Sequence, residues 1–200
     1  PCRNSPLPEP DGKEISFLFL ARLEKRKGGE IALRAFARAH TAFPAIRLTI
    51  AGSGPDGAFL VKLAGDLGIH RSVDFLGRVP RERLDSLFES HHVLLFPSIR
   101  DTSGNVVLEA MAAGRPVIAL RHQGVAEIAT VETAALVEVG SIRETITRFT
   151  IEILRLAKDK SIRTSLGAAG LQRVRSHFSW DAYATSIERA YRMALQSSQE

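Results

Sequence analysis

Short apolar runs alternate with segments of helical spacing along this chain, and that alternation restricts the folds it can adopt. Six runs have the character of buried strands: residues 15–21, 46–52, 73–77, 92–98, 116–120 and 134–139. Apolar residues with helical spacing fill gaps between them, at 29–40, 56–68 and 81–90. Strands that alternate with helices lie parallel and are joined by right-handed crossovers. The pattern predicts an α/β fold: a Rossmann-like, open and mostly parallel sheet of about six strands, with helices on both faces.

The two ends of the chain depart from this pattern. Residues 1–14 are rich in proline and polar side chains, which predicts a linker remnant followed by one folded domain over residues 15–200. From about residue 143 the pattern is helical, with breaks near Asp159 and before Ser179. The Ser179 hydroxyl is placed to cap the last helix. We therefore expect a helical C-terminal tail.

Composition restricts the class of protein further. A chain of 200 residues, 44% of them hydrophobic, is long enough to bury one core. No apolar run approaches the roughly 20 residues that a membrane span requires, and the N-terminus lacks the apolar centre of a signal peptide. The single cysteine, Cys2, excludes a disulfide framework and a multi-cysteine zinc site. These features predict a cytoplasmic protein.

The chain is basic, with a formal net charge of +5 and a pI near 9.8. Positive charge favours anionic partners such as phosphates and acidic lipid headgroups, although the basic residues are spread along the chain. Only 6% of the residues are aromatic, and no basic segment carries the aromatic side chains that stack on single strands. We expect no nucleic-acid partner. Peripheral attachment to the inner face of a membrane is an expectation that rests on the charge alone.

A glycine-rich turn, "GSGPDG", follows the second predicted strand. Its Gly52, Gly54 and Gly57 match the spacing of a dinucleotide-binding fingerprint. Asp74 follows at the end of the next strand, near the distance expected for a ribose-binding acid. Against this, the turn follows the second strand rather than the first, and Pro55 removes a backbone amide that would face a pyrophosphate. A tight strand-to-helix turn is the alternative, and an NAD-dependent oxidoreductase stays open as a rival function.

The turn after the first predicted strand, "ARLEKRKGG", is basic. Arg22 and Lys27 are expected at the carboxyl end of the sheet, where ligands of open α/β sheets bind. Two cations there suit a diphosphate, because fixed positive charge stabilises a leaving group that gains negative charge. The alternative interpretation is a solvated basic loop.

The stretch "RDTSGNVVLEAMAAG" follows the fourth predicted strand and carries two carboxylates eight positions apart. A helix that starts near Ser103 or Gly104 would offer its free amides to a phosphate. Glu109 then lies roughly 7.5 Å along the helix from Gly104, where its carboxylate can accept two hydrogen bonds from a ribose diol. Asp101, on the loop before the helix, would face the group attached to the phosphate. Taken singly, either acid would be better explained as an exposed helix glutamate or a partner of the helix dipole.

The sequence offers no motif for a catalytic metal. It has no Asp-x-Asp pair to hold a cation against a diphosphate and no Walker A motif, so we expect no metal and no cofactor. The histidines are scattered, and the adjacent His91 and His92 lack a partner at ligand spacing. We interpret them as surface or cap residues.

These motifs occur in the order of one family. Together they resemble the C-terminal, nucleotide-sugar-binding domain of the retaining GT-B glycosyltransferases of group 1, over nearly the whole chain from about residue 15. The family's Gly-Arg-Leu and Lys-Gly motifs are similar to "ARL" at 21–23 and "KG" at 27–28. Its Glu-x7-Glu signature is similar to Asp101 and Glu109.

Further motifs extend the resemblance, and a few positions depart from it. "QGVAE" at 123–127 is similar to the family's Gly-Gly-x-Pro-Glu turn, and "FSWD" at 178–181 to the start of its last helix. Asp101 is one methylene shorter than the usual glutamate, while Ala21 and Ala126 replace a glycine and a proline.

The resemblance implies a role for each matching residue. Arg22 and Lys27 would neutralise the diphosphate. Asp101 would lie near the hydroxyls of the donor sugar, and Glu109 would hold the ribose. The backbone positions implied near the phosphates or the nucleobase are Gly52, Arg78, Val79, Ser103, Gly104, Asn105 and Val106. The implied reaction is a metal-independent sugar transfer that retains the anomeric configuration, in the synthesis of lipopolysaccharide or another polysaccharide.

A GT-B enzyme has two such domains, and the resemblance covers only the donor-binding one. We therefore expect the N-terminal acceptor-binding domain to be missing from this chain. The isolated piece should bind a nucleotide diphosphate sugar but transfer nothing to a glycan or lipid-linked acceptor. The rivals that stay open are a noncatalytic nucleotide-binding module, the oxidoreductase and a sugar epimerase of the same architecture. Base recognition by backbone amides leaves no side-chain signature, so the sequence selects no nucleobase.

Overall fold

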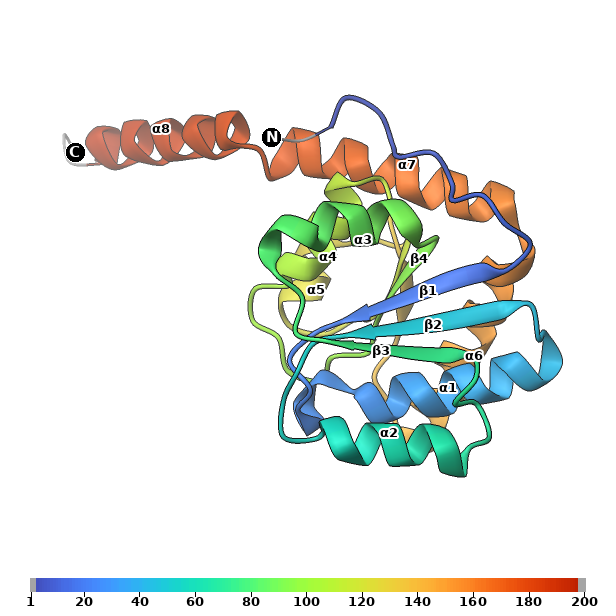
Figure 1. Ribbon diagram of the computed structural model, residues 1–200. Helices are drawn as coiled ribbons and strands as arrows, with labels where there is room; N and C mark the ends of the chain where they lie inside the picture. Colours follow the sequence, from blue (N-terminus) through green and yellow to red (C-terminus); the bar gives the residue numbers. More distant parts are fainter. Residues whose placement is uncertain (1–2, 198–200) are drawn as a thin grey trace.

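The computed structural model describes residues 3–197, and Cys2 lies outside them. Six parallel strands form an open sheet in the order β3-β2-β1-β4-β5-β6 (Figure 1). Their bounds are β1 (Ile15–Leu20), β2 (Ile46–Ala51), β3 (Val73–Gly77), β4 (Val93–Phe96), β5 (Val117–Leu120) and β6 (Ala135–Val137). The predicted fold class is confirmed, and each strand lies within two residues of its expected ends.

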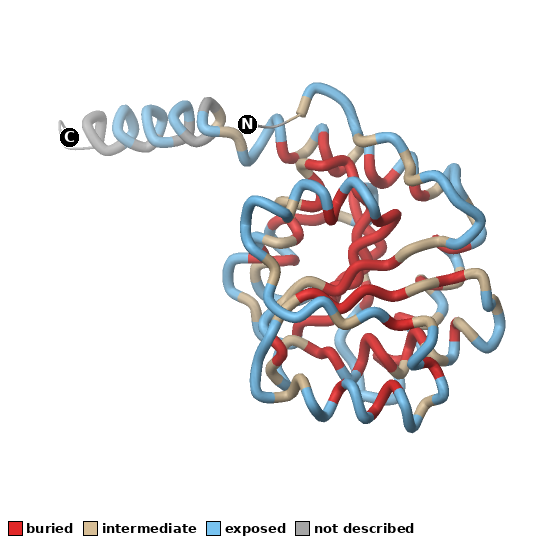
Figure 2. Tube along the Cα trace, in the orientation of Figure 1, coloured by how far each residue is buried: buried red, intermediate tan, exposed pale blue. Residues whose placement is uncertain are grey.

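Helices cover both faces of the sheet. One face carries α1 (Gly29–Ala42), α2 (Gly57–Asp66) and α6 (Ile142–Lys158). The other carries α3 (Leu84–Ser90), α4 (Asn105–Ala112), α5 (Gly124–Ile128) and part of α7 (Lys160–His177) (Figure 1). Successive side chains of a strand point to opposite faces, so Phe17 and Phe19 pack on the first layer and Leu18 on the second. Burial accordingly concentrates in the sheet and the inner sides of these helices (Figure 2).

The strand order reverses beside β1. The chain moves outward from β1 to β2 and β3, and then crosses to β4 on the other side of β1. In register, Phe17 of β1 is flanked by Leu48 of β2 and Val93 of β4. Open α/β sheets bind ligands beyond the carboxyl ends of the strands at such a reversal. The fold therefore predicts a ligand site at the turns that follow β1, β2, β3 and β4.

The C-terminal tail is helical, as predicted, and both predicted breaks are present. The Asp159 Oδ1 atom accepts a hydrogen bond of 3.1 Å from the Ile162 N–H at the start of α7. The Ser179 Oγ atom accepts one of 3.2 Å from the Ala182 N–H at the start of α8 (Trp180–Ser197). Figure 1 shows α8 projecting away from the sheet and its covering helices. Within residues 3–197, none of the helices combines the length and the apolar character that crossing a membrane requires.

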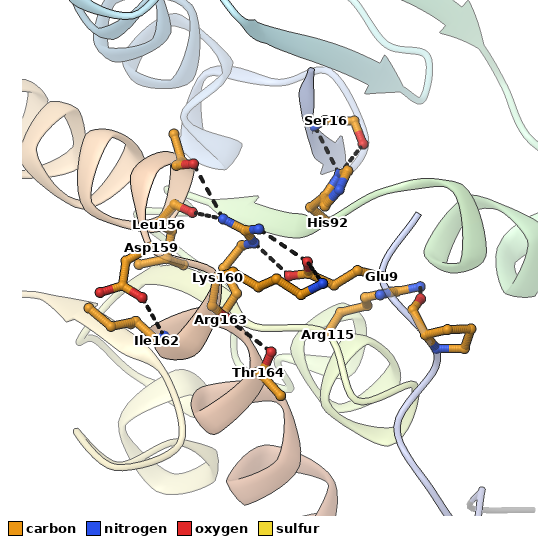
Figure 3. A network of polar contacts seen from close by, with 12 residues as sticks. Glu9, Ser16, His92, Arg115, Leu156, Asp159, Lys160, Ile162, Arg163 and Thr164 are labelled. Atoms are coloured by element: carbon orange, nitrogen blue, oxygen red, sulfur yellow. Dashed lines mark hydrogen bonds and ion pairs between the residues drawn. The ribbon is translucent and has the colours of Figure 1, made fainter. Parts of the chain in front are cut away.

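Residues 3–14 contain no helix or strand, yet they are held against the domain. The Leu7 N–H donates to the Ala113 carbonyl at 3.1 Å, and Arg115 Nη2 donates to the Pro8 carbonyl at 2.8 Å. The Glu9 carboxylate accepts two hydrogen bonds from Arg163 of α7, at 2.7 and 3.1 Å (Figure 3). The Arg163 side chain is only 5% exposed, so Glu9 supplies the counter-charge of a buried cation.

His92 is buried within the domain, so its interpretation as a surface or cap residue is wrong. The cap interpretation of His91 is confirmed, because His91 is the C-cap residue of α3, although its side chain is buried as well. His91 lies between the Thr49 hydroxyl and the Leu87 carbonyl, at 2.7 Å from each. The His92 Nδ1 atom accepts a hydrogen bond of 3.1 Å from the Ser16 N–H (Figure 3). The residues that cover these rings come from distant parts of the chain, so no local pattern could have marked them as buried.

We expect His92 to make the folded state sensitive to mild acid. Burial, with Arg163 nearby, lowers the pKa of His92 from 6.5 to about 4. The unfolded chain therefore binds more protons between these two values, and stability present above pH 6.5 is lost as the pH falls toward 4. The expected loss is about 2–3 kcal/mol. Chemical denaturation between pH 4 and 7 should show it, and His92→Asn, which keeps an acceptor for Ser16, should flatten the profile. An unchanged profile in that variant would assign the loss to other groups.

Candidate functional site

A cavity of about 560 Å³ opens at the carboxyl ends of β1, β2 and β3 and reaches the side of α4. Six of the predicted site residues line it: Arg22, Gly52, Arg78, Val79, Val106 and Glu109. They come from four separate turns or helices, as expected if each lies just after a strand. The remaining lining is largely apolar. Such a surface suits the flat ring of a ligand bound between the turn after β3 and α4.

Close backbone packing explains the glycine-rich turn below this cavity. Gly52 has a φ of +141°, and a Cβ atom there would collide with the Ala21 carbonyl oxygen. The Gly52 N–H also donates to the Gly77 carbonyl at 2.7 Å, which ties the turn after β2 to the end of β3. Asp74 is the second residue of β3, away from its carboxyl end, and bonds to Arg47 at 3.1 Å. The expected position of Asp74 as a ribose-binding acid is therefore wrong, and the tight-turn interpretation explains the glycines.

Glu109 is the carboxylate that faces the cavity. Glu109 lies in the second turn of α4 and is half-buried, and its carboxylate makes no hydrogen bond or ion pair with any residue in the described part of the chain. Burial raises the pKa of Glu109, the nearby Asp85 adds to this effect, and Arg81 opposes it. A half-buried carboxylate without a protein donor is a ready acceptor for hydroxyl groups of a ligand.

Three arginines, Arg22, Arg78 and Arg81, line the cavity with this carboxylate. Arg22 follows β1, and its Nε atom lies 2.7 Å from Glu24, which also bonds to Arg26 at 2.7 Å. Arg81, in the short 3-10 helix η2 (Arg81–Arg83) after β3, lines the same cavity and is a residue that the sequence interpretation missed. The signal was present: "VPRER" places cations directly after the third strand, as "ARLEKR" does after the first.

Lys27 and Asp101 lie apart from the lining of this cavity and pair with each other. Lys27 ends the 3-10 helix η1 (Lys25–Lys27), and its Nζ atom lies 2.6 Å from Asp101 Oδ2, with both side chains mostly buried. Asp101 Oδ1 accepts hydrogen bonds from the N–H groups of Gly104, at 2.9 Å, and Ser103, at 3.3 Å. Burial by itself would raise the pKa of Asp101, but the Lys27 ammonium and the Gly104 N–H outweigh it and hold this pKa below its ordinary value.

The helix predicted to start near Ser103 or Gly104 is α4, which begins at Asn105. Gly104 adopts a φ of +57°, and a Cβ there would press on Ile128 of α5. The Asp101 carboxylate bonds the two N–H groups directly before the helix, those of Ser103 and Gly104, and none of the N–H groups of α4 itself. Of the residues expected to hold phosphate through their backbone, only Val106 also lines the cavity.

An open parallel sheet whose strand reversal carries a cavity with a free carboxylate and three arginines defines a Rossmann-like α/β domain with a candidate ligand site at the carboxyl ends of its strands. The family described as "Glycosyl transferases group 1" matches residues 5–173. The chain belongs to this family.

Curated relatives agree with this assignment. A D-inositol 3-phosphate glycosyltransferase from Corynebacterium aurimucosum is 31% identical over 186 residues, which cover 88% of this chain and 42% of that protein. An uncharacterized glycosyltransferase from Methanocaldococcus jannaschii is 32% identical over 183 residues, which cover 92% of this chain and 46% of that protein. The chain therefore spans less than half the length of these relatives.

Solved structures show the same fold. TarM of S. aureus, as a variant in complex with fondaparinux, alpha-GlcNAc-glycerol and UDP, has a TM-score of 0.80 and 17% identity, covering 94% of this chain and 37% of that one. Sucrose-phosphate synthase from Thermosynechococcus elongatus has a TM-score of 0.74 and 29% identity, covering 92% and 46%. The C-terminal domain of a group 1 glycosyl transferase from Francisella tularensis has a TM-score of 0.74 and 21% identity, covering 83% and 87%.

Proposed function

We propose that this chain is the donor-binding half of a glycosyltransferase. It binds a nucleotide diphosphate sugar, and the longer protein transfers the sugar to a glycan or lipid-linked acceptor with retention of configuration and without a metal. The observation that carries this proposal is the cavity that unites Arg22 with a carboxylate, Glu109, that has no protein partner among the described residues. The solved relatives with bound UDP support a nucleoside diphosphate as the ligand class.

Each group has a distinct task in this proposal. Glu109 accepts hydrogen bonds from the ribose diol, and the turn at Arg78 and Val79 lies beside the nucleobase. Arg22 stabilises the negative charge that the diphosphate gains as the bond to the sugar breaks. Lys27, farther along the same turn, does the same while its ammonium is paired with Asp101. Asp101, at the start of α4, faces the sugar.

The acceptor-binding residues lie outside this chain in the proposal. The share of the relatives' length that the chain covers, 42% and 46%, supports that division. The isolated chain should therefore bind donor and transfer nothing. Detection of sugar transfer by the chain alone, in an assay with a glycan acceptor, would contradict the division. Synthesis of lipopolysaccharide or another polysaccharide, at the inner face of the membrane, is the setting that we propose for the longer protein.

A calorimetric screen with UDP, GDP, ADP and NAD tests the ligand class. We expect binding of one nucleoside diphosphate and none of NAD. Arg22→Ala should weaken that binding by roughly 5- to 10-fold, with a smaller effect at high salt, because an exposed cation acts through a screened charge. Arg71→Ala, at the amino end of β3, is the matched control and should leave the affinity unchanged. Binding of NAD that is indifferent to Arg22 would instead support an oxidoreductase.

A further inference from the structure

Gln123, in the turn between β5 and α5, has an unusual backbone conformation. Among the residues that the structure describes, it is the only one other than glycine with a positive φ, at 47°, and its ψ is −132°. Side chains with a Cβ atom rarely adopt such angles, and the conformation persists only where surrounding contacts impose it. If the turn required only these angles, glycine would meet the requirement without strain.

The next residue, Gly124, is explained by a close approach. A Cβ atom on Gly124 would lie 2.5 Å from the Thr102 carbonyl oxygen and 3.2 Å from the Ser103 nitrogen. The β5 turn is therefore packed directly against the loop that leads from β4 to α4. The two loops are separated by about twenty residues in sequence, and they meet at the carboxyl edge of the sheet.

The side chain of Gln123 holds the backbone of Asp101. Its Oε1 atom accepts a hydrogen bond of 2.9 Å from the Asp101 N–H, and the Gly124 N–H donates to the Asp101 carbonyl at 3.3 Å. The carboxylate of Asp101 is held from other directions by Lys27 and Gly104. Both backbone groups of Asp101 are thus fixed by the β5 turn. Within the part of the chain that the structure describes, the bond to Asp101 is the one hydrogen bond of the Gln123 side chain, and this residue is otherwise exposed.

We propose that Gln123 is a positioning residue for Asp101: its amide fixes the backbone from which the Asp101 carboxylate is presented, and the strained turn places that amide within reach. The inference rests on the proposed function, in which Asp101 faces the donor sugar. It explains why glutamine rather than glycine occupies a position of positive φ. Replacing Gln123 by glycine can therefore stabilise the fold by relieving the strained backbone, while it impairs the donor site by releasing Asp101.

Two variants separate positioning from a merely structural role. Gln123→Gly removes the amide and relieves the backbone strain, whereas Gln123→Ala removes the amide and keeps the strain. The melting temperature of the glycine variant should be unchanged or up to about 4 °C higher, and that of the alanine variant about 2–4 °C lower. If Gln123 only shaped the turn, the environment of Asp101 would be disturbed in the less stable alanine variant and unchanged in the glycine variant.

Nuclear magnetic resonance of the labelled chain reads Asp101 directly and needs no ligand. In both variants we expect the Asp101 amide to lose its protection from hydrogen exchange and the pKa of the Asp101 carboxyl to rise toward its ordinary value, because the contacts with Lys27 and Gly104 loosen. Wild-type protection and pKa in the glycine variant would overturn the proposal.

Titration with UDP-glucose, beside UDP, provides the functional readout. Both variants should bind UDP-glucose about 3- to 10-fold more weakly than the parent chain, the loss expected for one hydrogen bond, although only one of them is less stable; UDP, which has no sugar for Asp101 to face, should bind them as it binds the parent. Parental affinity of both variants for UDP-glucose would overturn the functional part of the inference. Failure of the parent chain to bind UDP or any other nucleoside diphosphate would contradict the proposed function instead, while exchange and pKa would still decide whether Gln123 positions Asp101.

Discussion

Replacing Glu109 by glutamine is expected to weaken binding of the nucleoside diphosphate by roughly 10- to 100-fold, the loss that accompanies removal of a hydrogen bond to a charged group. Glu109 has no protein partner in the described chain, so a ribose diol in the cavity meets a carboxylate that can accept from both hydroxyls. The glutamine amide keeps the size of the side chain but has one acceptor oxygen and no charge. Calorimetric titration of the parent and the variant measures the difference.

The same change should leave the folded state intact or more stable. Burial raises the pKa of Glu109, so its charged form is disfavoured by folding, and removing that charge relieves the cost. For the parent, nucleotide affinity should fall as the pH drops through this raised pKa, and Glu109→Gln should lack that step. Glu188→Gln, on α8, is a control that should bind as the parent does. Equal affinity of parent and Glu109→Gln would remove Glu109 from the site.

The sequence predicts the sheet well because a parallel sheet covered on both faces is built from continuous apolar runs. Residues 93–96 of β4 and 117–120 of β5 are all buried, and both runs are recognisable without any knowledge of their neighbours. Helix α5 was not predicted, because five residues give too little periodicity to detect. The first residue of α5, Gly124, packs against Thr102 and Ser103 in the loop before α4. This contact joins residues that lie far apart in the sequence, so a local pattern cannot reveal it.

The candidate site likewise has residues that the sequence predicts and contacts that it does not. Arg22, Arg78 and Glu109 could be placed at the carboxyl edge because each follows a strand that is itself predictable. The pairing of Lys27 with Asp101 could not, since the two residues lie 74 positions apart and either could have faced the cavity. The conformation of Gln123 was equally hidden, because a positive φ at a glutamine contradicts its intrinsic preference and is imposed by tertiary contacts.

Replacing Glu9 by glutamine is expected to lower the free energy of unfolding by about 3–4 kcal/mol, because it leaves a buried guanidinium without its counter-charge. Arg163 is 5% exposed, and its bonds to the Leu156 and Ala157 carbonyls do not neutralise it. Urea denaturation at pH 7 measures the loss. Glu30→Gln breaks an exposed pair with Arg34 at 2.8 Å, and this matched control should cost under about 0.5 kcal/mol.

The pH dependence separates this ion pair from the effect of His92. Burial alone would raise the pKa of Glu9, but the hydrogen bonds and charge of Arg163 outweigh it and hold this pKa below its ordinary value of 4.5. The contribution of Glu9 is therefore complete above pH 4.5 and is lost as the pH falls through the lowered value, whereas the loss due to His92 begins near pH 6.5. The difference between parent and Glu9→Gln should shrink only below pH 4.5.

A double substitution then tests whether the loss comes from the unpaired charge. In Glu9→Gln combined with Arg163→Met, the unpaired Arg163 cation is removed as well, so much of the stability should return even though the hydrogen bonds are gone. Additive losses in the double variant would mean that packing of the side chains, rather than charge neutralisation, anchors residues 3–14. Recovery would show that the loss in Glu9→Gln comes from the unpaired charge of Arg163, and that the remaining bonds of residues 3–14, such as those of Leu7 and Pro8, suffice to hold this segment on the domain.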